Sequence, residues 1–99
     1  MKYFDWDREK NEWLKEERGI CFEDVVHALD EGKELDRISH PNKKLHPNQK
    51  MIIINIENYA YIIPFVEDSE KLFLKTIIPS RKMTKKYLMK EKKLWNTTN

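Results

Sequence analysis

The sequence is poor in the residues on which several classes of site depend. It contains one cysteine, Cys21, and two glycines, Gly19 and Gly32, among 99 residues. A single cysteine cannot form an internal disulfide, which is typical of proteins from a reducing compartment. Two isolated glycines cannot build a glycine-rich phosphate loop, and no Cys/His spacing predicts zinc. The sequence therefore predicts no disulfide framework, no metal and no other cofactor.

Long apolar runs are also missing. No stretch approaches the roughly 18 apolar residues of a membrane-spanning helix, and the opening MKYFDWDREK lacks the apolar segment of a signal peptide. We therefore expect a cytoplasmic protein without membrane contact. The length is typical of one domain. We predict a single domain over 1–99, with an ordered core from about residue 3 to 94 and a frayed tail over 95–99.

Charge is distributed unevenly along the chain. The net charge is +2, but residues 1–36 carry 6 Lys/Arg against 12 Asp/Glu, a net of −6. Residues 37–99 carry 13 against 5, a net of +8. A basic surface on a small protein favours binding to nucleic acid or to an acidic protein, and charge alone does not distinguish the two.

The N-terminal part predicts two helices. Asp7 is a suitable N-cap and Gly19 a suitable end for the first, and the second ends near Gly32. Their expected core residues are Trp13 and Leu14 in the first helix, and Phe22, Val25, Val26 and Leu29 in the second. The latter four recur at i, i+3, i+4 and i+7, which is one face of a helix.

The following residues predict strands. An edge strand is expected over 34–39, and β-branched runs over 50–56 and 59–66 flank Glu57-Asn58, a two-residue hairpin turn. The predicted fold class is α+β, with two N-terminal helices, an antiparallel β-meander of three or four strands, and a C-terminal helix.

A further strand is expected over 72–78, stopping at Pro79, which has no N–H for the ladder. Alternation places Leu72, Leu74, Thr76 and Ile78 on one face, and Phe73, Lys75 and Ile77 on the other. Thr84 is the expected N-cap of a helix from about Lys85 to Lys93.

Four cations gather after this strand. They are Arg81, Lys82, Lys85 and Lys86. Cations beside the N-terminus of a helix repel one another unless an anion binds there. Two interpretations remain open: a phosphate-binding site and a solvated basic face.

Several segments resemble the BrnT-type toxins of type II toxin–antitoxin systems. They are Phe4-Asp5-Trp6-Asp7 with Lys10, Arg18-Gly19-Ile20-Cys21-Phe22-Glu23, the Asp36-x-x-x-His40 loop, and the run from Ile77 to Lys86. The resemblance implies a RelE-like fold and a metal-independent endoribonuclease that cleaves RNA to arrest growth. It also implies a DNA-binding antitoxin, encoded by the adjacent gene, that neutralises the toxin and can form an oligomer with it. The chain departs from the family at Tyr87, where relatives often have glutamate.

Metal-independent RNA cleavage requires a base for the 2′-hydroxyl, cations for the phosphorane and an acid for the leaving 5′-oxygen. Arg81 is the candidate for stabilising charge, since its guanidinium binds two phosphate oxygens and stays protonated. Candidates for proton transfer are His40, Glu67 and Tyr87, and candidates for RNA backbone binding are Lys75, Lys82, Lys85 and Lys86. Because a meander turn lies opposite the end of the next strand, we expect Glu67 far from Arg81. The alternative function is a non-catalytic RNA- or protein-binding module.

Overall fold

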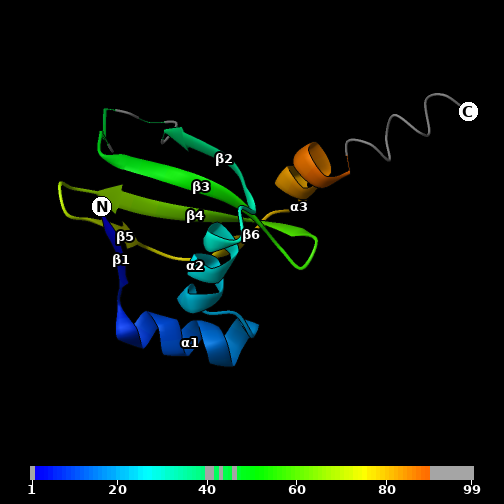
Figure 1. The fold of residues 1–99 in the computed structure, drawn as a ribbon, viewed down its shortest axis with the longest axis horizontal. Coiled ribbons are helices and arrows are strands. Elements are labelled where there is room, and N and C mark those ends of the chain that lie inside the picture. The colour runs from blue at the N-terminus through cyan, green and yellow to red at the C-terminus, as the bar shows by residue number, and fades with distance from the viewer. Residues whose placement is uncertain (1, 40–41, 43, 46, 90–99) are drawn as a thin grey trace, which may run out of the picture.

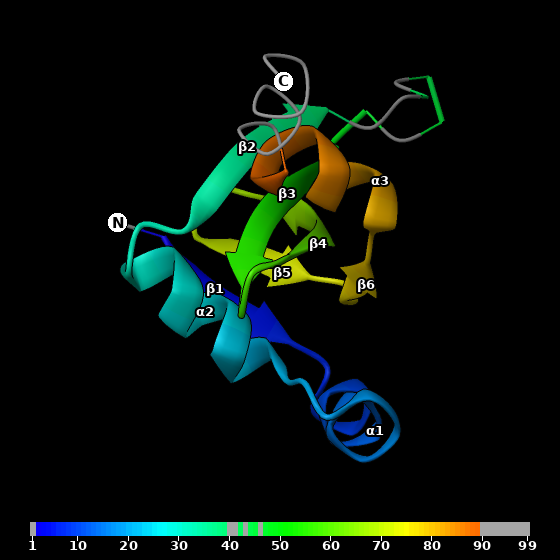
Figure 2. The same cartoon turned by 90° about the vertical axis from the view of Figure 1, so that its right-hand side faces the viewer.

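The fold is built on one sheet with helices on both of its faces (Figures 1 and 2). The computed structural model describes residues 2–39, 42, 44–45 and 47–89. Over these residues the predicted α+β class is confirmed. The predicted frayed tail over 95–99 and the end of the predicted last helix lie outside the described residues.

The described residues form ten elements. They are β1 (Tyr3–Trp6), α1 (Arg8–Arg18), α2 (Phe22–Asp30), β2 (Glu34–Ser39), β3 (Gln49–Ile56), β4 (Tyr59–Glu67), β5 (Lys71–Leu74), β6 (Ile78–Pro79), α3 (Arg81–Met83) and the π-helical segment η1 (Thr84–Leu88). The sheet order is β1-β5-β4-β3-β2, and β6 also pairs with β4. β1 and β5 are parallel, and the remaining pairs are antiparallel.

The strand β1 differs from the prediction, which had no strand before the first helix. Phe4 pairs with Leu72, and Trp6 pairs with Leu74. Trp6 also stacks on Phe22 of α2, with ring centroids 5.6 Å apart. A strand of four residues is too short to show a clear apolar alternation, and no tight turn connects it to its distant partner. The sequence therefore contains no local signal that predicts it. Its parallel pairing with β5 makes the sheet mixed.

The helix α1 has the predicted caps. Asp7 Oδ1 accepts a hydrogen bond from the Glu9 N–H at 3.0 Å, and Gly19 ends the helix at φ +66°. Trp13, however, is 44 % exposed and lies between the cations of Lys10 and Arg18, so its predicted core position is wrong. Leu14 is fully buried and holds this helix to the core.

A buried amide joins α1 to α2. Asn11 Nδ2 donates to Glu23 Oε1 at 2.7 Å, and Asn11 Oδ1 accepts from the Phe22 N–H at 2.7 Å. The N-terminus of α2 is also closed by Asp24, whose Oδ2 accepts from the Cys21 N–H at 3.0 Å. Through these bonds, the N–H groups at the start of α2 find acceptors without a serine cap.

The main core lies between the sheet and the two N-terminal helices (Figure 2). Its members are Leu14, Ile20, Phe22, Val25, Ala28, Ile52, Ile54, Ile63, Phe65, Leu72, Leu74 and Ile77. The opposite sheet face carries α3 and η1. The hairpin between β3 and β4 has the predicted turn, with φ +53° at Glu57 and +65° at Asn58.

The predicted continuous strand over 72–78 is instead two short strands. β5 ends at Leu74, and Ile78 pairs with Ile62 in the separate strand β6. Pro64 lies on β4 between these pairings and has no N–H to offer, while its carbonyl accepts from the Lys75 N–H at 2.8 Å. The interruption shifts the alternation, so Ile77 is buried and Ile78 is 41 % exposed, the reverse of a continuous strand's pattern.

Candidate nucleic-acid interface

The basic corner, defined as Arg81, Lys82, Lys85 and Lys86, lies on α3 and η1. The helix begins earlier than predicted, because Ser80 and not Thr84 is its N-cap. Ser80 Oγ accepts a hydrogen bond from the Met83 N–H at 3.1 Å. Arg81 and Lys82 therefore stand in the first helical turn and not in a loop, so all four cations belong to one helical segment.

Thr84 fixes this segment to the sheet. Its side chain is buried, and Oγ1 accepts from the Ala60 N–H at 2.9 Å while donating to the Ser80 carbonyl at 2.7 Å. The Ser80 N–H donates in turn to the Ala60 carbonyl at 3.0 Å. Ser80 and Thr84 thus satisfy both backbone groups of Ala60, as a neighbouring strand would.

Tyr87 provides a second attachment, to the edge strand β2. Its hydroxyl donates to Asp36 Oδ2 at 2.6 Å. This hydrogen bond raises the pKa of Tyr87 and, together with the Arg37 backbone N–H, lowers the pKa of Asp36. The Lys86 ammonium lies 5.3 Å from the centroid of the Tyr87 ring. Asp36 is a functional candidate that the sequence analysis missed, because nothing local links it to a residue 51 positions away.

None of the four cations of the basic corner forms an ion pair with a described carboxylate, although the charge of Lys86 helps to lower the pKa of the neighbouring Asp36. Elsewhere, ion pairs engage Lys2, Lys15, Lys33, Arg37, Lys50 and Lys71. At spacing i, i+4, Arg81 repels Lys85 and Lys82 repels Lys86, each pair by about 0.2–0.5 kcal/mol. The result is an exposed, fixed cluster of positive charge that suits an anionic ligand.

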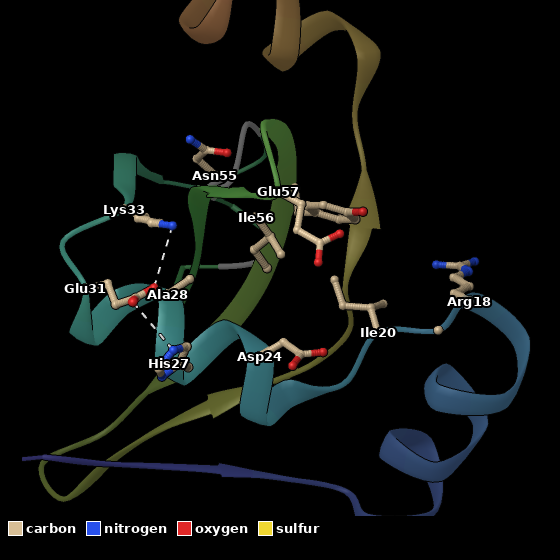
Figure 3. Close-up of a pocket in the computed structure, with 12 residues that line it drawn as sticks. Arg18, Ile20, Asp24, His27, Ala28, Glu31, Lys33, Asn55, Ile56 and Glu57 are labelled. Carbon is tan, nitrogen blue, oxygen red and sulfur yellow. Dashed lines mark ion pairs between the residues drawn. The ribbon is translucent and has the colours of Figure 1, made fainter.

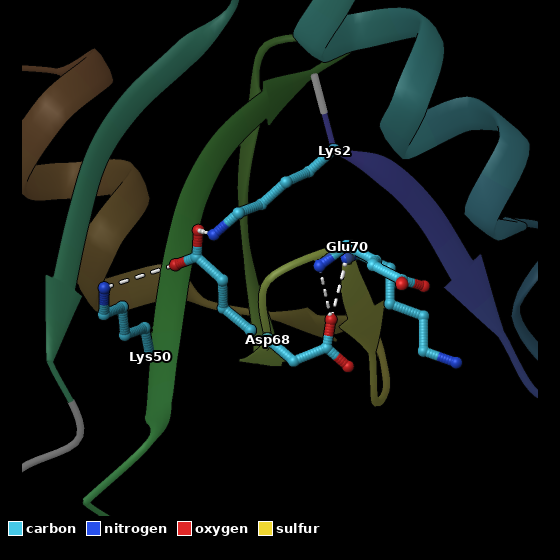
Figure 4. A network of polar contacts seen from close by, with 6 residues as sticks. Lys2, Lys50, Asp68 and Glu70 are labelled. Atoms are coloured by element: carbon cyan, nitrogen blue, oxygen red, sulfur yellow. Dashed lines mark hydrogen bonds and ion pairs between the residues drawn. The ribbon is translucent and has the colours of Figure 1, made fainter.

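Glu67 is the last residue of β4, at the end of the strand away from Ala60, and Figure 4 shows the polar contacts of Lys2 and Lys50 in this region. The Glu67 carboxylate contacts Lys2 Nζ at 2.6 Å and Lys50 Nζ at 3.3 Å, and these hydrogen bonds lower its pKa. Ala60, which anchors the basic corner, is separated from Glu67 by about 23 Å at 3.3 Å per strand residue. The structure therefore does not bring Glu67 together with Arg81.

Lys75, another predicted site residue, is not part of the corner's helical segment. Lys75 is exposed in the connection between β5 and β6, with its Nζ 5.9 Å from the centroid of the Phe73 ring. His40 lies outside the described residues. Of the predicted residues, the structure thus joins Arg81, Lys82, Lys85, Lys86 and Tyr87.

Comparison with protein-family models, curated proteins and solved structures finds no match to this chain. Among the described residues, no three His, Cys, Asp or Glu side chains gather where a metal ion could bind. None of the helices in the described ranges is long and apolar enough to cross a membrane. Function must therefore be argued from the basic corner itself.

Proposed function

We propose that this chain is the toxin of a type II toxin–antitoxin pair, with a RelE-like fold, and that it binds and cleaves RNA at the basic corner. The observation that carries the proposal is a set of four exposed cations, none of them in an ion pair with a described residue, on a segment anchored through Thr84 and Tyr87. Phosphate groups are the natural ligands for such a fixed cluster. The resemblance of the sequence to BrnT-type toxins supports the same assignment.

In this proposal Arg81 binds two oxygens of the reacting phosphate, and the lysines hold the neighbouring backbone. The 2′-oxygen attacks phosphorus as its proton passes to a base, for which His40 is the candidate. The bond from phosphorus to the 5′-oxygen breaks, and the leaving oxygen takes a proton from the Tyr87 hydroxyl. The products are a 2′,3′-cyclic phosphate and a 5′-hydroxyl. The Tyr87 hydroxyl carries this proton in its hydrogen bond to Asp36, which raises its pKa and which must break before the proton can pass to the 5′-oxygen.

The cellular context belongs to the proposal as well. A DNA-binding antitoxin from the adjacent gene would neutralise the toxin in the cytoplasm, and cleavage of RNA by free toxin would arrest growth. Neutralisation could occur by covering the basic corner, since an acidic segment would satisfy the same cations as RNA.

A non-catalytic RNA-binding module is the second candidate, and one observation favours it. The Tyr87 hydroxyl already donates to Asp36, so it must change partner before it can protonate RNA. With Glu67 at the far end of β4, the corner contains cations but no other described acid or base besides this pair. Such a site would hold phosphates without cleaving them.

The test is cleavage of purified RNA in EDTA by the wild type, by Arg81→Ala and by Arg8→Ala. Arg8 is an exposed arginine on α1 and serves as the matched control. We expect the wild type and Arg8→Ala to cleave equally and Arg81→Ala to be at least about 100-fold slower, as when one transition-state donor is removed. Binding without cleavage by all three proteins would support the binding module. Equal cleavage by all three would place the chemistry elsewhere.

A further inference from the structure

A cavity of about 470 Å³ lies on the sheet face opposite the basic corner (Figure 3). It is enclosed by α2, the junction between α1 and α2, and the β3–β4 hairpin. Its volume falls within the usual range of ligand pockets, which is about 300–1,000 Å³. Apolar surface comes from Ile20, Ala28, Ile56 and the ring of Tyr61.

Most charges at its rim are already engaged within the protein. Arg18 Nη1 donates to the Ile77 carbonyl at 2.8 Å. Glu31 lies between His27 and Lys33, with His27 Nε2 and Lys33 Nζ each 3.6 Å from its carboxylate (Figure 3). These groups frame the cavity and leave little charge to be satisfied by a ligand.

Two carboxylates are different. Asp24 and Glu57 both point into the cavity (Figure 3), and neither forms an ion pair with a described cation. Asp24 Oδ2 accepts hydrogen bonds from the Cys21 N–H and thiol at the N-terminus of α2, and no described lysine or arginine pairs with it. Burial and the neighbouring Glu57 carboxylate raise the pKa of Tyr61, which indicates negative charge at the cavity wall.

Glu57 also occupies a costly backbone position. Its φ is +53°, at the first position of a two-residue turn where glycine or asparagine is less strained. A strained residue that aims a charged side chain into a cavity suggests a functional requirement for that side chain.

We propose that this cavity binds a lysine or arginine side chain of a protein partner. The alkyl stem would pack on Ile20, Ile56 and Tyr61, and the cationic head would lie between Asp24 and Glu57. Lysine and arginine combine an apolar stem with a head group that only donates hydrogen bonds, which matches carboxylates that only accept them.

The rim limits the ligand to one positive charge. Arg18 and Lys33 lie on either side of the two carboxylates (Figure 3) and would repel the further charges of a polyamine. A single cationic side chain flanked by an apolar residue avoids this repulsion. Because the cavity and the basic corner are on opposite faces of the sheet, this inference holds whether or not the corner cleaves RNA.

The experiment uses acetyl-leucyl-arginine amide as the probe and its citrulline analogue, a neutral isostere, as the control ligand. Binding to the full chain is followed by backbone amide NMR shifts. We expect shifts at Ile20, Asp24, Glu57 and Tyr61, and about fivefold weaker binding of the citrulline peptide. Glu57→Gln should weaken binding of the arginine peptide by about the same factor. Glu16→Gln, at an exposed carboxylate on α1, should leave it unchanged.

Three results would overturn the inference. One is the absence of shifts at these four amides at millimolar peptide, and another is equal affinity for the arginine and citrulline peptides. The third is tighter binding of spermidine than of the peptide, which would assign the cavity to a free polyamine. Thermal melting of Glu57→Gln checks that the variant remains folded. The NMR shifts of the wild-type protein test the location of the site without using any variant.

Discussion

The two ends of β4 use lysine and arginine in opposite ways. At its C-terminal end, Lys2 and Lys50 both contact the carboxylate of Glu67 (Figure 4). At its N-terminal end, the cations of the basic corner form no ion pair with a described carboxylate, and the corner is held by hydrogen bonds of Thr84 to the backbone and of Tyr87 to Asp36. The lysines at the C-terminal end form ion pairs within the fold, whereas the cations at the N-terminal end form none with a described residue and can bind a ligand.

This difference is more informative than the number of cations. Lysines appear at both ends of the strand, so composition could not separate a structural pair from a binding site. What distinguishes the basic corner is that hydrogen bonds of Thr84 and Tyr87 fix its segment, while its four cationic side chains stay exposed and form no ion pair with a described residue. The following predictions test whether the two ends differ in function as they do in structure.

The largest expected difference is in RNA binding. Replacing Lys82, Lys85 and Lys86 together by alanine should reduce the slope of log affinity against log salt by about 2, since each contact with single-stranded RNA contributes about 0.7. When salt is raised from about 50 to 200 mM, the wild type should therefore lose roughly 20 times more affinity for RNA than the variant. Fluorescence anisotropy with labelled RNA measures it. The control variant Lys2→Ala/Lys50→Ala should keep the wild-type slope. An equal reduction of the slope in both variants would contradict the proposal that only the basic corner binds RNA.

The next effect is on stability. Thr84→Val should lower the free energy of unfolding by about 1–3 kcal/mol, because the buried Ala60 N–H loses its acceptor. Urea denaturation measures this change. Thr76→Val is the control, since Thr76 is half-buried and its hydroxyl has no hydrogen bond to a described residue. If both variants lose the same stability, Thr84 is not the anchor of the basic corner.

The smallest effect is the pH dependence at the Glu67 end. The pKa of Glu67 is lowered in the folded state, so its contribution to stability is complete above the ordinary glutamate pKa of 4.5. The contribution is lost as the pH falls through the lower folded pKa. Glu67→Gln should therefore lose less stability than the wild type between pH 7 and pH 3, in urea denaturation at each pH.

Three other carboxylates limit that change. Glu23, Asp36 and Asp68 also have lowered pKa values, from hydrogen bonds that remain in the variant, so some acid sensitivity should persist. Glu70→Gln is a suitable control, because Glu70 is exposed and forms no ion pair with a described residue. Parallel pH curves for the wild type and Glu67→Gln would mean that the two lysines add no stability.

The sequence predicted the features that depend on neighbouring residues. Asp7 and Gly19 define α1 through local capping, apolar periodicity defines α2, and Glu57-Asn58 makes the hairpin turn. For the same reason, the four cations and Tyr87 could be assigned to one corner from their spacing. The exact start of their helix could not be predicted, because Ser80 and Thr84 can both act as an N-cap. In the structure Thr84 is hydrogen-bonded to Ala60 of the sheet, and Ser80 is the cap.

The predictions that were wrong or incomplete concern features that depend on residues far apart in the sequence. The break between β5 and β6 reflects Pro64 on the adjacent strand, which no pattern within 72–78 reveals. The contact between Tyr87 and Asp36 joins a helical segment to an edge strand far away in the sequence. These features depend on the sheet's register, and a single sequence contains no direct signal for that register.

The parallel strand β1 has a consequence for folding kinetics. Tyr3 pairs with Lys71, which the ribosome adds 68 residues later. The β3–β4 hairpin, closed by two residues, can form within microseconds, whereas the β1 edge must wait for a contact between distant segments. During synthesis the outer edge of β5 therefore stays open after the hairpin has formed, and addition of the first-made strand completes the sheet.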